Sequence, residues 1–203
     1  MNKYFEKNRQ KLFDLMKDNS IAVVFAGEAP VKRGDENYPF SPDRHFYYLT
    51  GVERERIILA MTKINGKNNA VLYIEPHNGQ MAKWIGATMT KEEAVEISGI
   101  ENIKLTEDFE KDMEEISAEV STIYLDGERH DLPEIQMPEG MKKFFPNQQY
   151  EDLFPIISEL RTIKEDWELE RMKKAMDITR MAIEEMMKNA SPNMMEYEIE
   201  AYY

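Results

Sequence analysis

The amino-acid sequence predicts an α/β fold in which helices flank a mixed β-sheet. Short apolar runs with strand character alternate along the chain with segments of helical periodicity, which is typical of α/β proteins. An Asn65-Gly66 pair lies between two of these runs and predicts a tight hairpin, so at least two strands are expected to be antiparallel. The sheet should therefore be mixed rather than wholly parallel.

The first half of the chain is predicted to begin with a helix and continue into strands. Apolar residues recur at helical spacing over residues 1–18. A fully apolar run over residues 21–26 predicts a buried strand, and residues 27–37 predict a polar loop. Further strands are predicted over residues 46–49, 56–62 and 70–74, the last two forming the hairpin.

The second half continues the alternation. Thr90 and Glu93 have the spacing of a capping box, and Gly99 supplies a stop, which predicts a helix over residues 90–98. Residues 106–119 are predicted to be an amphipathic helix. Weaker patterns predict strands over residues 103–105 and 122–125, a proline-containing loop over 131–146 and a short helix over 153–160.

The last forty or so residues differ from the rest. Residues 162–189 form one long helical pattern with an apolar stripe. Ser191-Pro192 then predicts the start of another helix, and the chain reaches Tyr203 without a helix stop signal. We therefore expect one domain over residues 1–160, followed over residues 161–203 by a linker and the first helices of a truncated second domain.

Composition excludes several classes of function. The chain has no cysteine, which excludes disulfide frameworks, thiolate metal sites and cysteine nucleophiles. Its net charge of −13 disfavours nucleic acid as a partner, because phosphates are bound through Lys and Arg. No apolar run is long enough to span a membrane and the N-terminus lacks a signal-peptide core, so a cytoplasmic location without a membrane partner is expected.

Residues able to carry chemistry are sparse. The three histidines, His45, His77 and His130, are scattered and match no metal-ligand motif. A polar segment over residues 126–131 could bind a cation weakly, but a solvated turn after a strand explains it better. We therefore predict neither catalytic residues nor metal ligands in this chain.

One segment is unusually dense in aromatic residues and prolines. Residues 37–51 read Asn-Tyr-Pro-Phe-Ser-Pro-Asp-Arg-His-Phe-Tyr-Tyr-Leu-Thr-Gly. The prolines favour an extended loop. Taken by itself, the segment is explained better by a rigid loop whose aromatic side chains cover the sheet than by a functional role.

In combination with other motifs, this segment resembles the N-terminal domain of Xaa-Pro aminopeptidases and prolidases, the creatinase-like or pita-bread peptidases. The similarity extends in order along nearly the whole chain. The matching segments are residues 38–40, Asp43, residues 46–51, the strand at 70–74, Lys-Trp-Ile-Gly at 83–86, Leu-Arg-Thr-Ile-Lys at 160–164 and residues 196–201. Ser41 and His45 depart from it, since an arginine and an acidic residue are common there.

The resemblance implies a ribonuclease H-like N-terminal domain that shapes the active-site entrance and the oligomer of a proline-specific aminopeptidase. The parent enzyme would be a dimer that binds proline-containing peptides and uses two divalent metal ions, usually manganese, held outside this chain. Trp84, His45 and Tyr38 become candidates for the substrate entrance. Trp84 could equally have only a core role.

Two readings of the family resemblance remain open. The chain could come from an active peptidase, or from a relative that has lost its metals and serves as a protein-binding module. The sequence also does not separate an aminopeptidase that trims long peptides from a dipeptidase.

Overall fold

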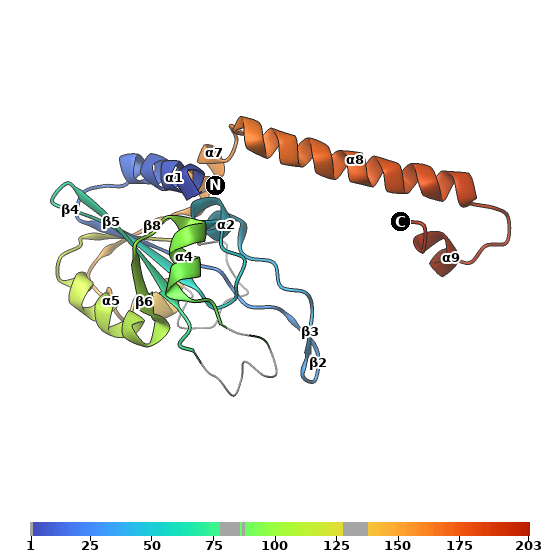
Figure 1. The fold of residues 1–203 in the computed structure, drawn as a ribbon. Helices are drawn as coiled ribbons and strands as arrows, with labels where there is room; N and C mark the ends of the chain where they lie inside the picture. Colours follow the sequence, from blue (N-terminus) through green and yellow to red (C-terminus); the bar gives the residue numbers. More distant parts are fainter. Residues whose placement is uncertain (1, 78–85, 87, 128–137) are drawn as a thin grey trace. The chain divides into compact units, whose positions relative to one another are not determined.

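A six-stranded mixed β-sheet forms the centre of residues 1–161 in a computed structural model of the chain (Figure 1). The structure describes residues 2–77, 86, 88–127 and 138–203. The strand order is β6-β5-β4-β1-β7-β8. Strand β4 runs antiparallel to both β1 and β5, whereas the β1–β7, β5–β6 and β7–β8 pairs are parallel. The predicted α/β class with a mixed sheet is confirmed.

The strands of this sheet are short, and five of them have bounds close to the predicted ones, whereas the strand at residues 149–152 was not predicted from the sequence. The hairpin turns at Asn65 and Gly66, whose φ angles of 51° and 72° are those required by a two-residue turn of this kind. The strands are β1 (Ser20–Phe25), β4 (Ile58–Ile64), β5 (Lys67–Ile74), β6 (Asn102–Leu105), β7 (Thr122–Leu125) and β8 (Gln149–Asp152). A separate two-stranded ribbon, β2 (Val31–Arg33) and β3 (Glu36–Asn37), occupies part of the predicted polar loop.

Helices cover both faces of the sheet, and alternation along β1 explains why both faces are apolar. Ala22 and Val24 belong to one buried cluster, whereas Ile21, Val23 and Phe25 belong to the other. The first cluster includes residues of α1 (Asn2–Leu15), α2 (Arg44–Thr50), α4 (Lys91–Ser98) and α7 (Phe154–Leu160). The second includes residues of α5 (Phe109–Ser117) and α6 (Pro138–Met141). A 3₁₀ turn, η1 (Thr106–Asp108), precedes α5.

The prediction of a strand over residues 46–49 was wrong, because this aromatic run lies within the helix α2. Asp43 accepts hydrogen bonds from the backbone N–H groups of His45 and Phe46 through Oδ1 and thereby caps the helix. Gly51 ends it with a φ of 69°. A short apolar run is compatible with either structure, and here the two caps favour the helix.

Helix α1 also fixes α2 in place. The side chain of Asn8 donates a hydrogen bond to the backbone oxygen of Tyr48 over 2.9 Å, and Arg9 donates to that of Leu49 over 2.7 Å. Burial lowers the pKa of Arg9 to about 10, against an opposing effect of Glu6. These two buried polar side chains satisfy carbonyls that the last turn of a helix leaves unpaired.

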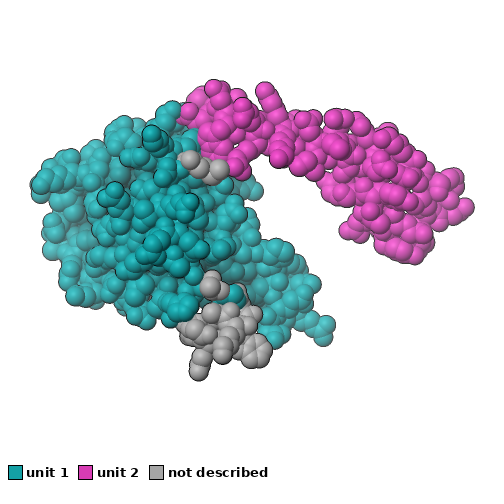
Figure 2. All heavy atoms as spheres, viewed as in Figure 1, with its two compact units in different colours: residues 1–161 teal, residues 162–203 magenta. Residues whose placement is uncertain are grey.

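The chain divides into two compact units, residues 1–161 and residues 162–203 (Figure 2). The second unit contains α8 (Asp166–Asn189) and α9 (Glu196–Glu200), and neither helix buries a residue. Helix α9 begins later than the Ser191-Pro192 signal predicted. No helix among the described residues combines the length and the apolar character needed to cross a bilayer.

Candidate functional site

A cavity of about 510 Å³ lies beside the carboxyl ends of the parallel strands β1 and β7. Ala26 and Gly27 follow β1, and Asp126 follows β7. The remaining wall comes from the segment that leads into α2 and from one face of α7. The lining residues beyond the strand ends are Glu28, Ser41, Pro42, Asp43, Arg44, His45, Phe154, Ser158 and Arg161. Carboxyl ends of strands are where α/β sheets usually bind ligands.

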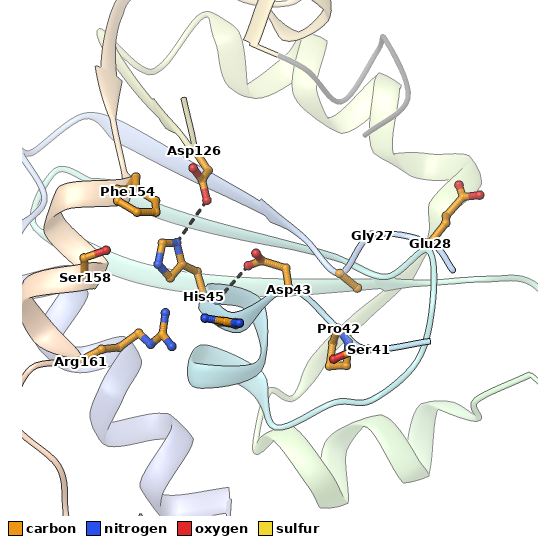
Figure 3. Close-up of a pocket in the computed structure, with 12 residues that line it drawn as sticks. Gly27, Glu28, Ser41, Pro42, Asp43, His45, Asp126, Phe154, Ser158 and Arg161 are labelled. Atoms are coloured by element: carbon orange, nitrogen blue, oxygen red, sulfur yellow. Dashed lines mark hydrogen bonds and ion pairs between the residues drawn. The ribbon is translucent and has the colours of Figure 1, made fainter. Parts of the chain in front are cut away.

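His45 is the best-defined polar group of this cavity. Its side chain is only 4% exposed, and its Nδ1 lies 3.2 Å from Oδ2 of Asp126. The Phe154 ring packs against the imidazole at a centroid distance of 5.2 Å. Figure 3 shows the imidazole ring of His45 directed toward Asp126. The side chain of Arg161 extends toward the same ring from another side of the cavity. The imidazole is therefore held in one orientation.

Asp43 joins this pair from the start of α2. Its Oδ1 caps the helix through bonds of 2.9 and 2.8 Å to the N–H groups of His45 and Phe46, which fixes its carboxylate. One ligand atom each from Asp43, His45 and Asp126 lie within 4.8 Å of one another. Asp43, Asp126 and Arg161 each take part in at least one further polar or electrostatic interaction. The cavity thus brings two carboxylates, an imidazole and cationic groups together.

The structure does not bring the three predicted entrance residues together among the parts it describes. His45 is buried in the cavity wall. Tyr38 is 53% exposed beside the β2–β3 ribbon, where its N–H donates to the backbone oxygen of Pro30, and it does not line the cavity. Trp84 lies outside the described residues, and so does His130.

Sequence reasoning missed Asp126 as the partner of His45 and Arg161 as a residue of the same cavity. Asp126 is 81 positions away from His45, and only the parallel pairing of β1 and β7 brings the two close together. The signal available in the sequence was that Asp126 directly follows the strand predicted over residues 122–125. Arg161 was noticed only as part of the resemblance at residues 160–164.

A second polar cluster lies on the opposite face of the sheet. The Tyr73 hydroxyl donates to Oδ2 of Asp112 over 2.7 Å, and the Lys104 ammonium lies 2.6 Å from the same oxygen. Burial, followed by the Asp112 carboxylate, raises the pKa of Tyr73. Burial acts to raise the pKa of Asp112, but the hydrogen bonds from Lys104 and Tyr73 outweigh it and lower that pKa. This cluster joins α5 to the sheet.

Comparisons with known proteins give the same family as the sequence motifs. Over 197 residues the chain is 27% identical to the Xaa-Pro aminopeptidase of Haemophilus influenzae, covering 97% of this chain and 45% of that protein. A Bacillus anthracis structure assigned as an aminopeptidase P is 35% identical, with a TM-score of 0.90 over 99% of this chain and 50% of that one. Aminopeptidase P of Escherichia coli with the inhibitor Pro-Leu has the same fold, with a TM-score of 0.87 and 23% identity over 100% of this chain and 48% of that one.

The chain spans slightly under half the length of the H. influenzae relative. The family model of the aminopeptidase P N-terminal domain matches residues 5–124, which is more than half of the chain. The match includes most of the sheet and the segment that carries Asp43 and His45. The chain therefore belongs to the aminopeptidase P N-terminal domain family.

Proposed function

We propose that this chain is the non-catalytic N-terminal domain of a proline-specific metallo-aminopeptidase, which removes an N-terminal residue that precedes proline. The observation that carries the proposal is the agreement with the B. anthracis structure, at 35% identity and a TM-score of 0.90 over 99% of this chain. Similarity over half of that longer protein fits a domain that works together with another part.

In the whole protein, two divalent metal ions, manganese by family resemblance, would activate the water that hydrolyses the peptide bond before proline. No residue of this chain is assigned to that metal pair. The domain's role is to narrow the entrance to the active site and to contribute to a homodimer, in the cytoplasm. Trp84 and Tyr38 are the candidates for the entrance. Trp84 is a candidate by family resemblance, and Tyr38 is in addition exposed and available to a peptide. His45 is buried, so its contribution would be to hold in place the segment that leads into α2.

The experiment for the entrance role uses the complete polypeptide that joins this chain to a catalytic half. Trp84→Ala and Tyr38→Ala are compared with Val31→Ala, which changes an exposed residue of the neighbouring ribbon. In the Trp84→Ala and Tyr38→Ala variants, we expect kcat/KM to fall for Xaa-Pro tripeptides and to fall less for long peptides. The reason is that a wider entrance discriminates less between short and long peptides. Equal kinetics in all three variants would remove both residues from the entrance.

The assignment as an enzyme domain has its own test. The 203-residue chain alone should not hydrolyse Xaa-Pro peptides in excess Mn²⁺, whereas the complete polypeptide should. Turnover by the purified chain alone would contradict the non-catalytic role. A complete polypeptide that binds peptides or proteins but never hydrolyses them would instead identify a protein-binding module.

A further inference from the structure

The Asp43–His45–Asp126 cluster has the geometry of a metal-ion site. It is built from three points of the fold: the residue that caps α2, the first turn of that helix, and the residue after β7. His45 is 4% exposed, so the imidazole nitrogens have little access to bulk water. The two carboxylates and the imidazole supply oxygen and nitrogen donors of the kinds that divalent transition ions bind.

The distances fit one ion. Divalent transition ions bind imidazole nitrogen and carboxylate oxygen at roughly 2.0–2.2 Å. Neighbouring ligand atoms in such a shell are about 3.0–3.5 Å apart, by geometry from those bond lengths. Nδ1 of His45 and Oδ2 of Asp126 are 3.2 Å apart, and all three groups offer atoms within 4.8 Å of one another. Small side-chain rotations would therefore bring the third ligand into the shell.

Contacts with neighbouring groups orient the side chains of Asp43 and His45, as metal ligands require. Oδ1 of Asp43 accepts two backbone N–H bonds, which orients the carboxylate. Phe154 packs against the His45 ring. Arg44, Arg161 and Glu28 also line the cavity, so an entering ion meets charges of both signs.

We propose that Asp43, His45 and Asp126 form a divalent transition-metal site within this domain, with Zn²⁺ as its preferred ion. One imidazole and two carboxylates make a mixed nitrogen and oxygen ligand set, for which Zn²⁺ exceeds Mn²⁺ in affinity. Water or a carboxylate-bearing ligand in the cavity would complete the coordination shell. The ion would connect the segment entering α2 to the end of β7.

The test is titration of the metal-free 203-residue chain with Zn²⁺, in competition with a chromophoric chelator. We expect one ion bound per chain, and binding of Mn²⁺ at least about tenfold weaker. His45→Asn and Asp126→Asn should each weaken Zn²⁺ binding by at least about tenfold. His77→Asn is the matched control, because His77 is an exposed histidine outside the cavity, and it should bind Zn²⁺ as the unchanged chain does.

A second measurement covers the case in which a cavity variant fails to fold. The unchanged chain has three histidines, so its imidazole NMR signals can be assigned by comparison with His77→Asn and His130→Asn. One equivalent of Zn²⁺ should shift or broaden the His45 signals. The proposal is overturned if those signals do not respond, if both cavity variants bind Zn²⁺ as tightly as the unchanged chain, or if His77→Asn abolishes binding.

Discussion

Helices α1 and α8 have similar amphipathic sequences but different surroundings. In α1, the apolar residues Phe5, Leu12 and Phe13 are buried in residues 1–161. In α8, no residue is buried, and Met176 and Met187 are 69% and 75% exposed. Apolar periodicity therefore predicts that a helix forms and which face is apolar, but burial depends on a partner elsewhere in the fold.

The first prediction tests this difference with a matched pair of side-chain truncations, one in α1 and one in α8. Leu12→Ala should lower the free energy of unfolding of residues 1–161 by about 2–5 kcal/mol, because it leaves a cavity at a fully buried position. Met176→Ala should change it by less than about 0.5 kcal/mol, because the side chain is 69% exposed. Urea unfolding followed by near-UV circular dichroism measures both. Similar losses would mean that α8 is buried in solution.

A second prediction concerns the contact between α1 and the end of α2. A Cβ at Gly51 would lie 2.1 Å from Cε2 of Phe5, and the φ of 69° disfavours side chains there. Gly51→Ala should therefore cost about 2–4 kcal/mol, combining backbone strain with displacement of a buried ring.

Gly66→Ala is the control for this backbone strain. Gly66 has a φ of 72°, but a Cβ there would meet no atom within 4 Å. It should lose only about 1 kcal/mol in the same unfolding assay. Equal losses at the two glycines would show that Phe5 moves aside without cost and that the α1–α2 contact is loose.

The third prediction extends the comparison to ionic contacts. The folded-state pKa of Asp112 is lowered, so its stabilising effect is complete above the unfolded-state value of about 3.9 and is lost as the pH falls through the folded-state pKa. Asp112→Asn should therefore show a smaller decrease in stability between pH 5 and pH 2 than the unchanged chain.

Glu184→Gln is the matched change in α8, where the Glu184 carboxylate pairs with Arg180 over 2.7 Å on an exposed surface. It should leave the pH profile of residues 1–161 unchanged, because exposed pairs contribute little. Unfolding midpoints in urea at a series of pH values measure both variants. An Asp112→Asn profile that superimposes on that of the unchanged chain would show that the cluster with Tyr73 and Lys104 does not stabilise the fold.

Local chemistry explains which elements the sequence could predict. Thr90 and Glu93 form the expected capping box, and Gly99 ends α4 with a φ of 70°. The Asn65-Gly66 turn joins β4 to β5 as expected. These signals lie within a few residues of the element they define, so the sequence contains them without knowledge of tertiary contacts.

The failures arose where several local signals compete or where distant residues meet. The aromatic run at residues 46–49 has strand propensity, but the Asp43 cap and Gly51 make it helical. Strand β8 has two half-buried residues between two exposed ones, which gives no alternating pattern, and it is set by pairing with β7. For the cavity, His45 was identified from the sequence, whereas its contact with Asp126 depends on the strand order of the sheet.

The smallest expected effect comes from removing α8 and α9 altogether. A chain that ends at Arg161 keeps the whole first unit, including the sheet and both buried clusters. Since no residue of α8 or α9 is buried, the urea midpoint of residues 1–161 should not change.

The two chains should differ instead in association, because the longer one exposes apolar side chains on α8 that favour self-contact. Sedimentation velocity at several concentrations separates these effects: the longer chain should sediment faster as its concentration rises, while the shorter one should not. A lower urea midpoint in the shorter chain would show that α8 supports the first unit, and identical sedimentation would show that the apolar face of α8 has no affinity for itself.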